Sequence, residues 1–207
     1  MPRFEVVSKY ANSNITLPKR STAHSAGYDF EVAEDIKIPP ETEHNIKLWN
    51  YLYEQNGQTT PKEVDLKDLA DATKITKARP TLVPTGIKCQ LNPDQYLELS
   101  VRSSCPLKSW LILANGVGIV DSDYYNNPDN EGHIYFQIIN LGPVEVVLHK
   151  GDKIGQGVIK HFDLVDDDKA EGLRTGGFGS TTDTSKPITW EQITIDELIE
   201  KGIIPNG

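Results

Sequence analysis

The segment 174–182 has the composition of a nucleotide clasp. Glycines, one aromatic ring, hydroxyls and one cation occur together in it, among them Arg174, Phe178, Gly179, Ser180 and Thr181. Glycines let backbone N–H groups converge on phosphate oxygens, hydroxyls add donors, and a ring between glycines can lie over a base. On this segment alone, a flexible Gly/Ser linker is the alternative.

The segment 115–124 carries a candidate catalytic carboxylate. It is an apolar run with two glycines that ends in the pattern Asp-x-Asp-Tyr, and Asp121 is its first acid. The pattern indicates a hairpin that presents polar backbone to a ligand, with the carboxylate at its mouth. A carboxylate there could accept a proton from an attacking water. A calcium loop is excluded, because the EF-hand pattern requires Gly where Asn126 stands and Glu where Gly132 stands.

Three shorter patterns are less specific by themselves. One brings a cation and two hydroxyls to a strand end and could hold phosphate oxygens or cap a loop; its residues are Arg102, Ser103 and Ser104. Another places Asp29 two residues after a glycine that enters a strand, and a solvated turn acid is the alternative there. The last, residues 151–156, is a turn into a strand that offers Lys153 and Gln156.

Strands must position these segments, because the dominant hydrophobic period is two. Residues 96–102 place Leu97, Leu99 and Val101 on one face, and residues 133–138 bury Ile134, Phe136 and Ile138. Further strands are predicted at 4–8, 28–32, 36–38, 81–91, 144–148 and 154–162, separated by turn residues. Many short strands predict an all-β sandwich or jelly roll.

Helical signals are few. Asp65 could cap a short helix through Lys74, and Thr194 with Glu197 predicts a short helix over 195–201. The polar, irregular stretch from about 47 to 77 is interpreted as an insertion rather than a second domain. We therefore expect one β domain over 1–182 and a C-terminal extension with a short helix over 183–207.

Composition limits the function classes. The chain has 207 residues and a formal net charge of -9, which argues against a protein that coats nucleic acid. No stretch approaches the length of a membrane span, and the first residues lead into a strand rather than a signal peptide, so we expect a cytoplasmic protein. Cys89 and Cys105 have no zinc or disulfide-framework spacing and are expected to be ordinary thiols.

In this order, the five segments resemble the five motifs of the trimeric dUTP diphosphatase (dUTPase) family. The resemblance covers about residues 4–182, and its most specific parts are residues 118–124 and 176–181. It implies a β jelly roll, a homotrimer with active sites at subunit boundaries, and magnesium-dependent cleavage of dUTP to dUMP and pyrophosphate.

The resemblance also implies roles for single residues. Asp121 would be the base that activates water for attack on the α-phosphorus, and Tyr124 would pack beneath the deoxyribose. The base would be read by backbone and amide groups of Asn115, Gly118, Ile119 and Val120. Phosphates would be bound by Arg102, Ser103, Ser104, Gln156, Arg174, Gly179, Ser180 and Thr181, with Phe178 stacked on uracil. Asp29 would lie near the water shell of a Mg2+ ion held mainly by the triphosphate.

Several positions depart from the family pattern. Ser104 and Lys153 replace a usual glycine and a usual arginine, and Arg174 lies one residue closer to the glycines. Residues 125–131 separate Tyr124 from Gly132, where the family commonly has a single residue. That loop is expected to alter the rim of the site.

Two rival functions remain. A dCTP deaminase would share the fold, but that family has a catalytic glutamate where Gln137 stands, and an amide cannot act as an acid or base. The other rival is a non-catalytic protein that binds a partner under nucleotide control, with the insertion and the extension as contact surfaces.

Overall fold

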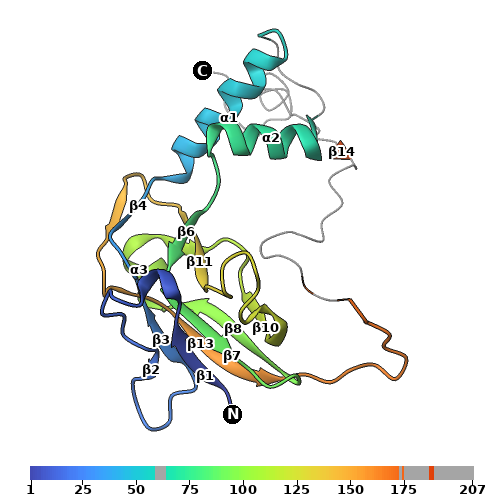
Figure 1. The fold of residues 1–207 in the computed structure, drawn as a ribbon. Coiled ribbons are helices and arrows are strands. Elements are labelled where there is room, and N and C mark those ends of the chain that lie inside the picture. Colours follow the sequence, from blue (N-terminus) through green and yellow to red (C-terminus); the bar gives the residue numbers. More distant parts are fainter. Residues whose placement is uncertain (59–63, 173, 175–186, 189–207) are drawn as a thin grey trace, which may run out of the picture. The chain divides into compact units, whose positions relative to one another are not determined.

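The computed structural model describes residues 1–58, 64–172, 174 and 187–188. The chain divides into two compact units, one formed by residues 1–43 and 80–181 and the other by residues 44–79 and 182–207. The first, which we call the β unit, contains most of the described strands and the candidate site. Most of its elements are labelled in Figure 1.

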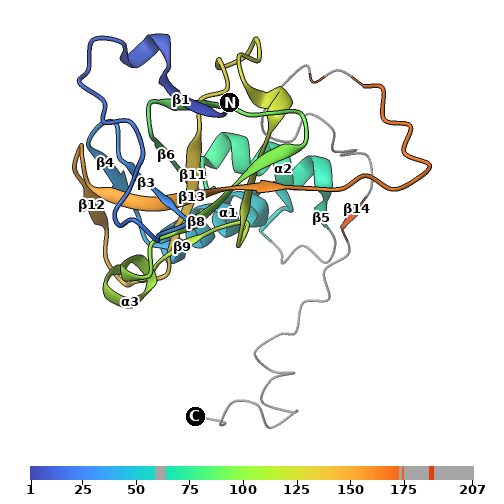
Figure 2. The same cartoon turned by 90° about the horizontal axis from the view of Figure 1, so that it is seen from below.

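The larger sheet of the β unit has five antiparallel strands in the order β10-β8-β13-β3-β2. Their bounds are β2 Lys19–Arg20, β3 Tyr28–Glu31, β8 Gln95–Val101, β10 Gly118–Asp121 and β13 Lys153–His161. Figure 2 shows the long strand β13 running across the unit, where it pairs with both β8 and β3. β10 forms one edge of this sheet.

A second sheet has the order β6-β11-β9, and two strand pairs, β1 with β7 and β4 with β12, complete the unit. The bounds of these strands are β1 Arg3–Val6, β4 Ile36–Ile38, β6 Thr81–Pro84, β7 Ile87–Gln90, β9 Leu111–Leu113, β11 Tyr135–Asn140 and β12 Val146–Leu148. Short helical turns lie at Ser8–Tyr10, Ser104–Ser109 (α3) and Ser122–Tyr124.

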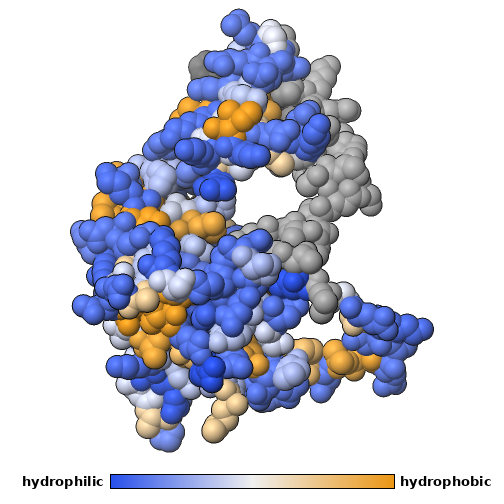
Figure 3. All heavy atoms as spheres, viewed as in Figure 1, coloured by the Kyte–Doolittle hydropathy of each residue, from blue (hydrophilic) through white to orange (hydrophobic). Residues whose placement is uncertain are grey.

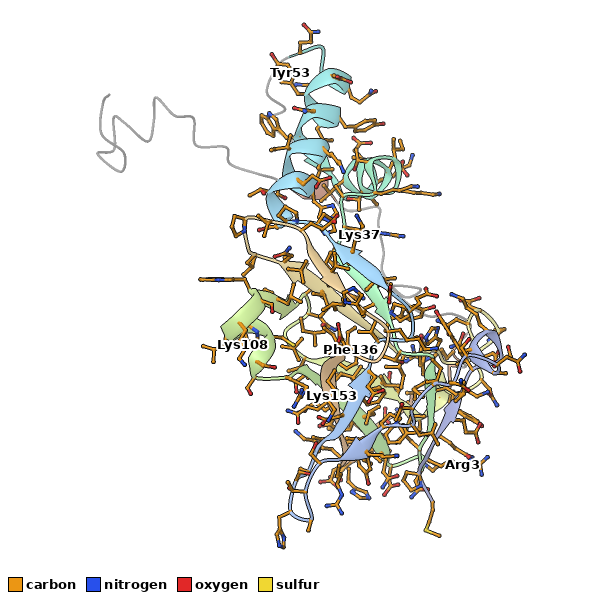
Figure 4. All side chains as sticks on the ribbon, turned by 90° about the vertical axis from the view of Figure 1, so that its left-hand side faces the viewer. Arg3, Lys37, Tyr53, Lys108, Phe136 and Lys153 are labelled. Atoms are coloured by element: carbon orange, nitrogen blue, oxygen red, sulfur yellow. The ribbon has the colours of Figure 1, made fainter. Side chains whose placement is uncertain are left out.

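The core lies between the two sheets. Phe30 of β3 and Phe136 of β11 are both fully buried, and their ring centroids are 5.8 Å apart. Figure 4 shows Phe136 in the interior of the unit, whereas Lys108 projects from α3. Because the two rings come from different sheets, the sheets pack face to face. The all-β sandwich expected from the sequence is confirmed.

Gly155 allows this close packing. A Cβ added there would stand 2.5 Å from the Phe136 Cζ, so any larger residue would overlap the ring. Next to it, the pairing of β13 with β3 shifts register between Lys153 and Gly155, which marks a bulge. The aromatic ring of one sheet therefore sits directly against the backbone of the other.

The predicted strands occur, with shifted ends and one interruption. The expected strand over 81–91 is broken into β6 and β7 at Gly86, whose φ is +71. The expected hairpin over 115–124 is wrong, since β9 pairs with β11 and β10 pairs with β8. The chain crosses from one sheet to the other there. α3 was not predicted.

The second unit is partly helical. Its elements are α1 Glu41–Gln55, which begins at its boundary, β5 Val64–Asp65, α2 Leu66–Thr76 and β14 Pro187–Ile188, and β14 pairs with β5. The helix predicted after Asp65 is confirmed as α2. α1 was not predicted. The helix expected over 195–201 lies outside the described residues.

In the described part of the chain, no helix combines the length and apolar character needed to cross a membrane. Hydrophilic residues cover much of the face shown in Figure 3. Cys89 and Cys105 are both buried and free, as expected.

Candidate active site

A pocket of about 210 Å³ opens on the β unit. Its wall combines side chains from β8, β10 and β11 with those of the turns after β9 and β10. The lining residues are Leu99, Leu113, Asn115, Gly118, Ile119, Val120, Asp121, Tyr124, His133, Ile134, Tyr135, Gln137 and Arg174. The lining thus combines apolar and amide side chains with two charged ones, Asp121 and Arg174.

The turn between β9 and β10 shapes one side of the pocket. Gly116 has a φ of +70, and its N–H donates to the Leu113 carbonyl at 3.0 Å. Gly118 then lies tight against Leu99, since an added Cβ would be 3.0 Å from the Leu99 Cβ. The side chain of Asn115 makes no hydrogen bond to any described residue, so its amide is free to bind a ligand.

Asp121 and Tyr124 occupy the end of β10 and the helical turn that follows. Tyr124 is 9% exposed, and its hydroxyl donates to the His133 carbonyl at 3.0 Å. Burial raises the pKa of Tyr124, which keeps this hydroxyl a donor. The carboxylate of Asp121 is half-exposed. It can therefore reach both a ligand and solvent water.

Arg174 joins these residues from far along the chain. Its guanidinium donates to Asp121 at 2.5 Å and to Asp123 at 2.8 Å, and it lies 5.8 Å from the centroid of the Tyr124 ring. The structure thus brings Arg174 to the pocket. Phe178, Gly179, Ser180 and Thr181 lie outside the described residues.

A second cluster of predicted residues gathers around Asp29, where β3, β13 and the end of β8 meet. The Asp29 carboxylate accepts from Lys153 at 2.8 Å and from Ser21 at 2.6 Å, and Arg102 lies 3.6 Å away. Burial raises the pKa of Asp29, but the bonds from Lys153 and Ser21 outweigh it, so the net pKa is lowered. The carboxylate stays ionised and holds two cations in place.

Gln156 completes this second cluster. It pairs with Asp29 across β13 and β3, and its side chain packs over Gly27. Ser103 and Ser104 lie at the start of α3, directly after Arg102. None of the residues of this cluster lines the pocket. In one chain, the predicted site therefore consists of two separate parts.

Three polar residues of the pocket were not predicted as site residues: His133, Tyr135 and Gln137. The alternation over residues 133–138 was the signal for them, because side chains on the face opposite Phe136 point away from the core between the sheets. His133 is 3% exposed and accepts a hydrogen bond from the Gly86 N–H at 2.8 Å. Burial lowers the pKa of His133 to about 4. The Gln137 side chain makes no hydrogen bond within the described part of the chain.

Metal binding by the protein alone is not indicated. Among the described residues, no group of three or more His, Cys, Asp or Glu side chains could hold an ion.

The amino-acid sequence matches the model of a known protein family. The dUTPase family model matches residues 64–182, which include both the pocket and the clasp segment. The chain belongs to the dUTPase family. Its relatives include the deoxyuridine 5'-triphosphate nucleotidohydrolase of Lactococcus lactis subsp. lactis, 41% identical over 180 residues that cover 86% of this chain and 95% of that protein. The enzyme of the same name from Laribacter hongkongensis is 34% identical and covers 62% of this chain and 88% of its own.

Solved dUTPase structures share the fold. The crystal structure of dUTPase from Streptococcus mutans is 37% identical, with a TM-score of 0.58, and the match covers 79% of this chain and 98% of that one. The dUTPase of the Staphylococcus aureus phage phi11 matches with a TM-score of 0.53 at 15% identity, over 85% of this chain and 99% of that one. The second likeness concerns the fold alone.

Proposed function

We propose that this member of the dUTPase family hydrolyses dUTP to dUMP and pyrophosphate, with Asp121 as the general base. The observation that carries the proposal is the half-exposed Asp121 carboxylate at a pocket with apolar and amide walls. Such a carboxylate can take a proton from the water that attacks the α-phosphorus. General-base catalysis contributes about 10²- to 10⁴-fold in rate.

The pocket suits a uracil base and its sugar. β10 is an edge strand, so alternate backbone groups of Gly118, Ile119 and Val120 are not used by β8 and can read the edge of the base. The side-chain amide of Asn115, which makes no hydrogen bond within the described residues, would help to recognise the base. The Tyr124 ring lies at the pocket wall, where it would pack beneath the deoxyribose and exclude a 2′-hydroxyl.

The second cluster suits the phosphates. Arg102, Lys153 and Gln156 supply charge and an amide, and Ser103 and Ser104 supply hydroxyls. Since this cluster does not line the pocket of its own chain, we propose a homotrimer in which one subunit's pocket faces a neighbour's phosphate cluster. The sedimentation coefficient of the purified protein tests the oligomeric state.

The clasp segment would close the site. Phe178 would stack on the base, a contact worth about 1–3 kcal/mol. Arg174, Gly179, Ser180 and Thr181 would bind the terminal phosphate. In the structure Arg174 instead pairs with Asp121, so substrate binding would require this ion pair to open. The Arg174 guanidinium would then exchange the Asp121 carboxylate for a phosphate and so remain paired with an anion.

Mg2+ is the proposed cofactor. Asp29 offers the oxygen ligands that Mg2+ accepts, and it lies among residues suited to phosphate. It would contact the water shell of an ion bound mainly by the triphosphate. The ion would neutralise phosphate charge.

The substrate is a free nucleotide, and we place the enzyme in the cytoplasm, which cell fractionation would test.

Pyrophosphate release from dUTP, dCTP, dTTP and UTP with Mg2+ tests the function. We expect turnover of dUTP, and in Asp121→Asn a rate lower by about 10²- to 10⁴-fold with unchanged thermal unfolding. Asp123→Asn is the matched control, since it also removes a carboxylate charge paired with Arg174 but not the base. We expect a smaller loss there than in Asp121→Asn.

The same assay separates the rivals. An Asp121→Asn enzyme that keeps its rate within tenfold would remove Asp121 as the base. Conversion of dCTP to a uracil nucleotide would identify a deaminase. Nucleotide binding without turnover of any substrate would favour a regulatory protein.

A further inference from the structure

The loop 125–131 is a folded element with its own hydrogen bonds. The Asn126 N–H donates to the Glu131 carbonyl at 3.0 Å, and the Glu131 N–H donates to the Asn127 carbonyl at 3.0 Å. The His133 N–H donates to the Asn130 carbonyl at 3.0 Å. These bonds close the loop upon itself between Tyr124 and the start of β11.

The outer side of the loop is fixed to β1 and β7. The Tyr125 hydroxyl donates to Glu5 at 2.7 Å, and Lys88 donates to Asn126 at 2.6 Å. The Glu131 carboxylate accepts from the Ser8 N–H at 3.1 Å. The loop therefore has a defined position on the β unit.

The inner side of the loop bonds to Tyr124 at two points, its backbone carbonyl and its hydroxyl. Asn127 is 5% exposed, and its amide donates to the Tyr124 carbonyl at 3.0 Å. The amide of Asn130 donates to the Tyr124 hydroxyl at 2.9 Å. The same hydroxyl donates to the His133 carbonyl, so Asn130 and His133 together fix the position of the phenol oxygen.

Asn130 is itself held in place. Its side-chain oxygen Oδ1 accepts from the Asn127 amide at 2.8 Å and from the Gly132 N–H at 3.0 Å. Gly132 has a φ of +78, and an added Cβ would be 2.5 Å from the Tyr124 carbonyl oxygen, so glycine is required there. These two hydrogen bonds to Oδ1 fix the orientation of the Asn130 side chain, so that its NH2 group points toward the Tyr124 hydroxyl.

We propose that Asn130 is a positioning residue that fixes the Tyr124 ring at the pocket wall and thereby sets the preference for deoxyribose over ribose. The proposal rests on the proposed function, in which this ring packs beneath the sugar. A 2′-hydroxyl differs from hydrogen by one oxygen atom, so a small displacement of the ring would make room for it. A ring held at both ends resists that displacement.

The test compares the ratio of kcat/KM for dUTP to that for UTP in four proteins. Asn130→Ala removes the amide that holds the hydroxyl, and we expect the ratio to fall about tenfold or more. Tyr124→Phe removes the hydroxyl and leaves the bonds of Asn130 to Asn127 and Gly132, and the ratio should fall by a similar factor. The double variant should fall no further than Tyr124→Phe alone, because without the hydroxyl the Asn130 amide has lost the group that it holds.

Tyr125→Phe is the matched control. It removes the bond from the same loop to Glu5 without touching Tyr124, so the ratio should stay at the wild-type value. A general loosening of the loop would lower the ratio in this control as well and would overturn the proposal. So would an unchanged ratio in Asn130→Ala.

If Asn130→Ala does not fold, Tyr124→Phe decides alone, and an unchanged ratio in that variant overturns the proposal. Failure of the proposed function is a separate result. In that case the wild-type protein itself would not hydrolyse dUTP.

Discussion

His133 makes the stability of the protein depend on pH. The ring is 3% exposed, lies 4.0 Å from the Tyr135 ring between centroids, and accepts the Gly86 N–H through Nε2. A protonated imidazole is charged and has no acceptor, so protonation would both bury a charge and break this bond. Burial, aided by the positive charge of Lys9, lowers the pKa of His133 from 6.5 to about 4.

The magnitude follows from that difference in pKa. In the unfolded chain the ring takes up a proton as the pH falls below about 6.5, whereas in the folded protein it stays neutral until about pH 4. The unfolded state therefore binds more protons over this window, and the free energy of unfolding falls as the pH falls. Between pH 7.5 and pH 5.0 the loss from this residue is about 2 kcal/mol.

Urea denaturation at pH 7.5 and pH 5.0 measures this loss, at one fixed protein concentration because an oligomer's stability depends on concentration. His133→Gln keeps an acceptor for the Gly86 N–H but cannot titrate, so its loss should be smaller than the wild type's by about 2 kcal/mol. His24→Gln is the control, because His24 is exposed. It should behave as the wild type.

Two carboxylates with lowered pKa values, Glu5 and Glu131, contribute mainly outside this window. Hydrogen bonds lower the pKa of Glu5 and Glu131, so their contributions to stability are present above their unfolded pKa of 4.5 and are lost mainly at lower pH. They are also common to all three proteins. If His133→Gln and the wild type lost the same free energy between the two pH values, the reasoning about His133 would be refuted.

Two further variants test the packing and the pocket. Gly155→Ala would force a methyl group into the Phe136 ring and should lower the free energy of unfolding by about 1–3 kcal/mol in urea denaturation, whereas Gly172→Ala, with nothing within 4 Å, should have almost no effect. Equal effects in both variants would contradict the packing argument. Gln137→Ala removes from the pocket an amide that is unpaired within the described residues, and it should raise KM for dUTP about tenfold with a smaller change in kcat. Steady-state kinetics measure both constants. An unchanged KM would show that Gln137 does not contact the substrate.

The sequence predicted the strands well because alternation is a local property. Leu97 and Leu99 of β8 and Phe136 and Ile138 of β11 are buried as expected. α1 was missed because no residue in it is buried, so the apolar period that reveals a helix is weak. A helix of this kind leaves little trace in hydrophobic patterning.

The predicted site was harder to locate, because its geometry depends on which strands meet. Asp121 and Tyr124 line the pocket, as their shared motif suggested, but His133 and Gln137 join them only because the two sheets bring the segments around β10 and β11 to the same pocket. Likewise, no spacing in the sequence indicates that Arg174 pairs with Asp121. Such contacts between distant segments follow from tertiary structure.

The contact between Gly155 and Phe136 also bears on how the protein reaches its native state. β13 places Gln156 opposite Asp29 and pairs on its two sides with β3 and β8. If β13 paired one residue out of register, Ile154 or Gln156 would replace Gly155 beneath the Phe136 ring, and the two sheets could not close. The contact of Gly155 with Phe136 therefore disfavours a one-residue slip of β13, which would also displace Gln156 from Asp29.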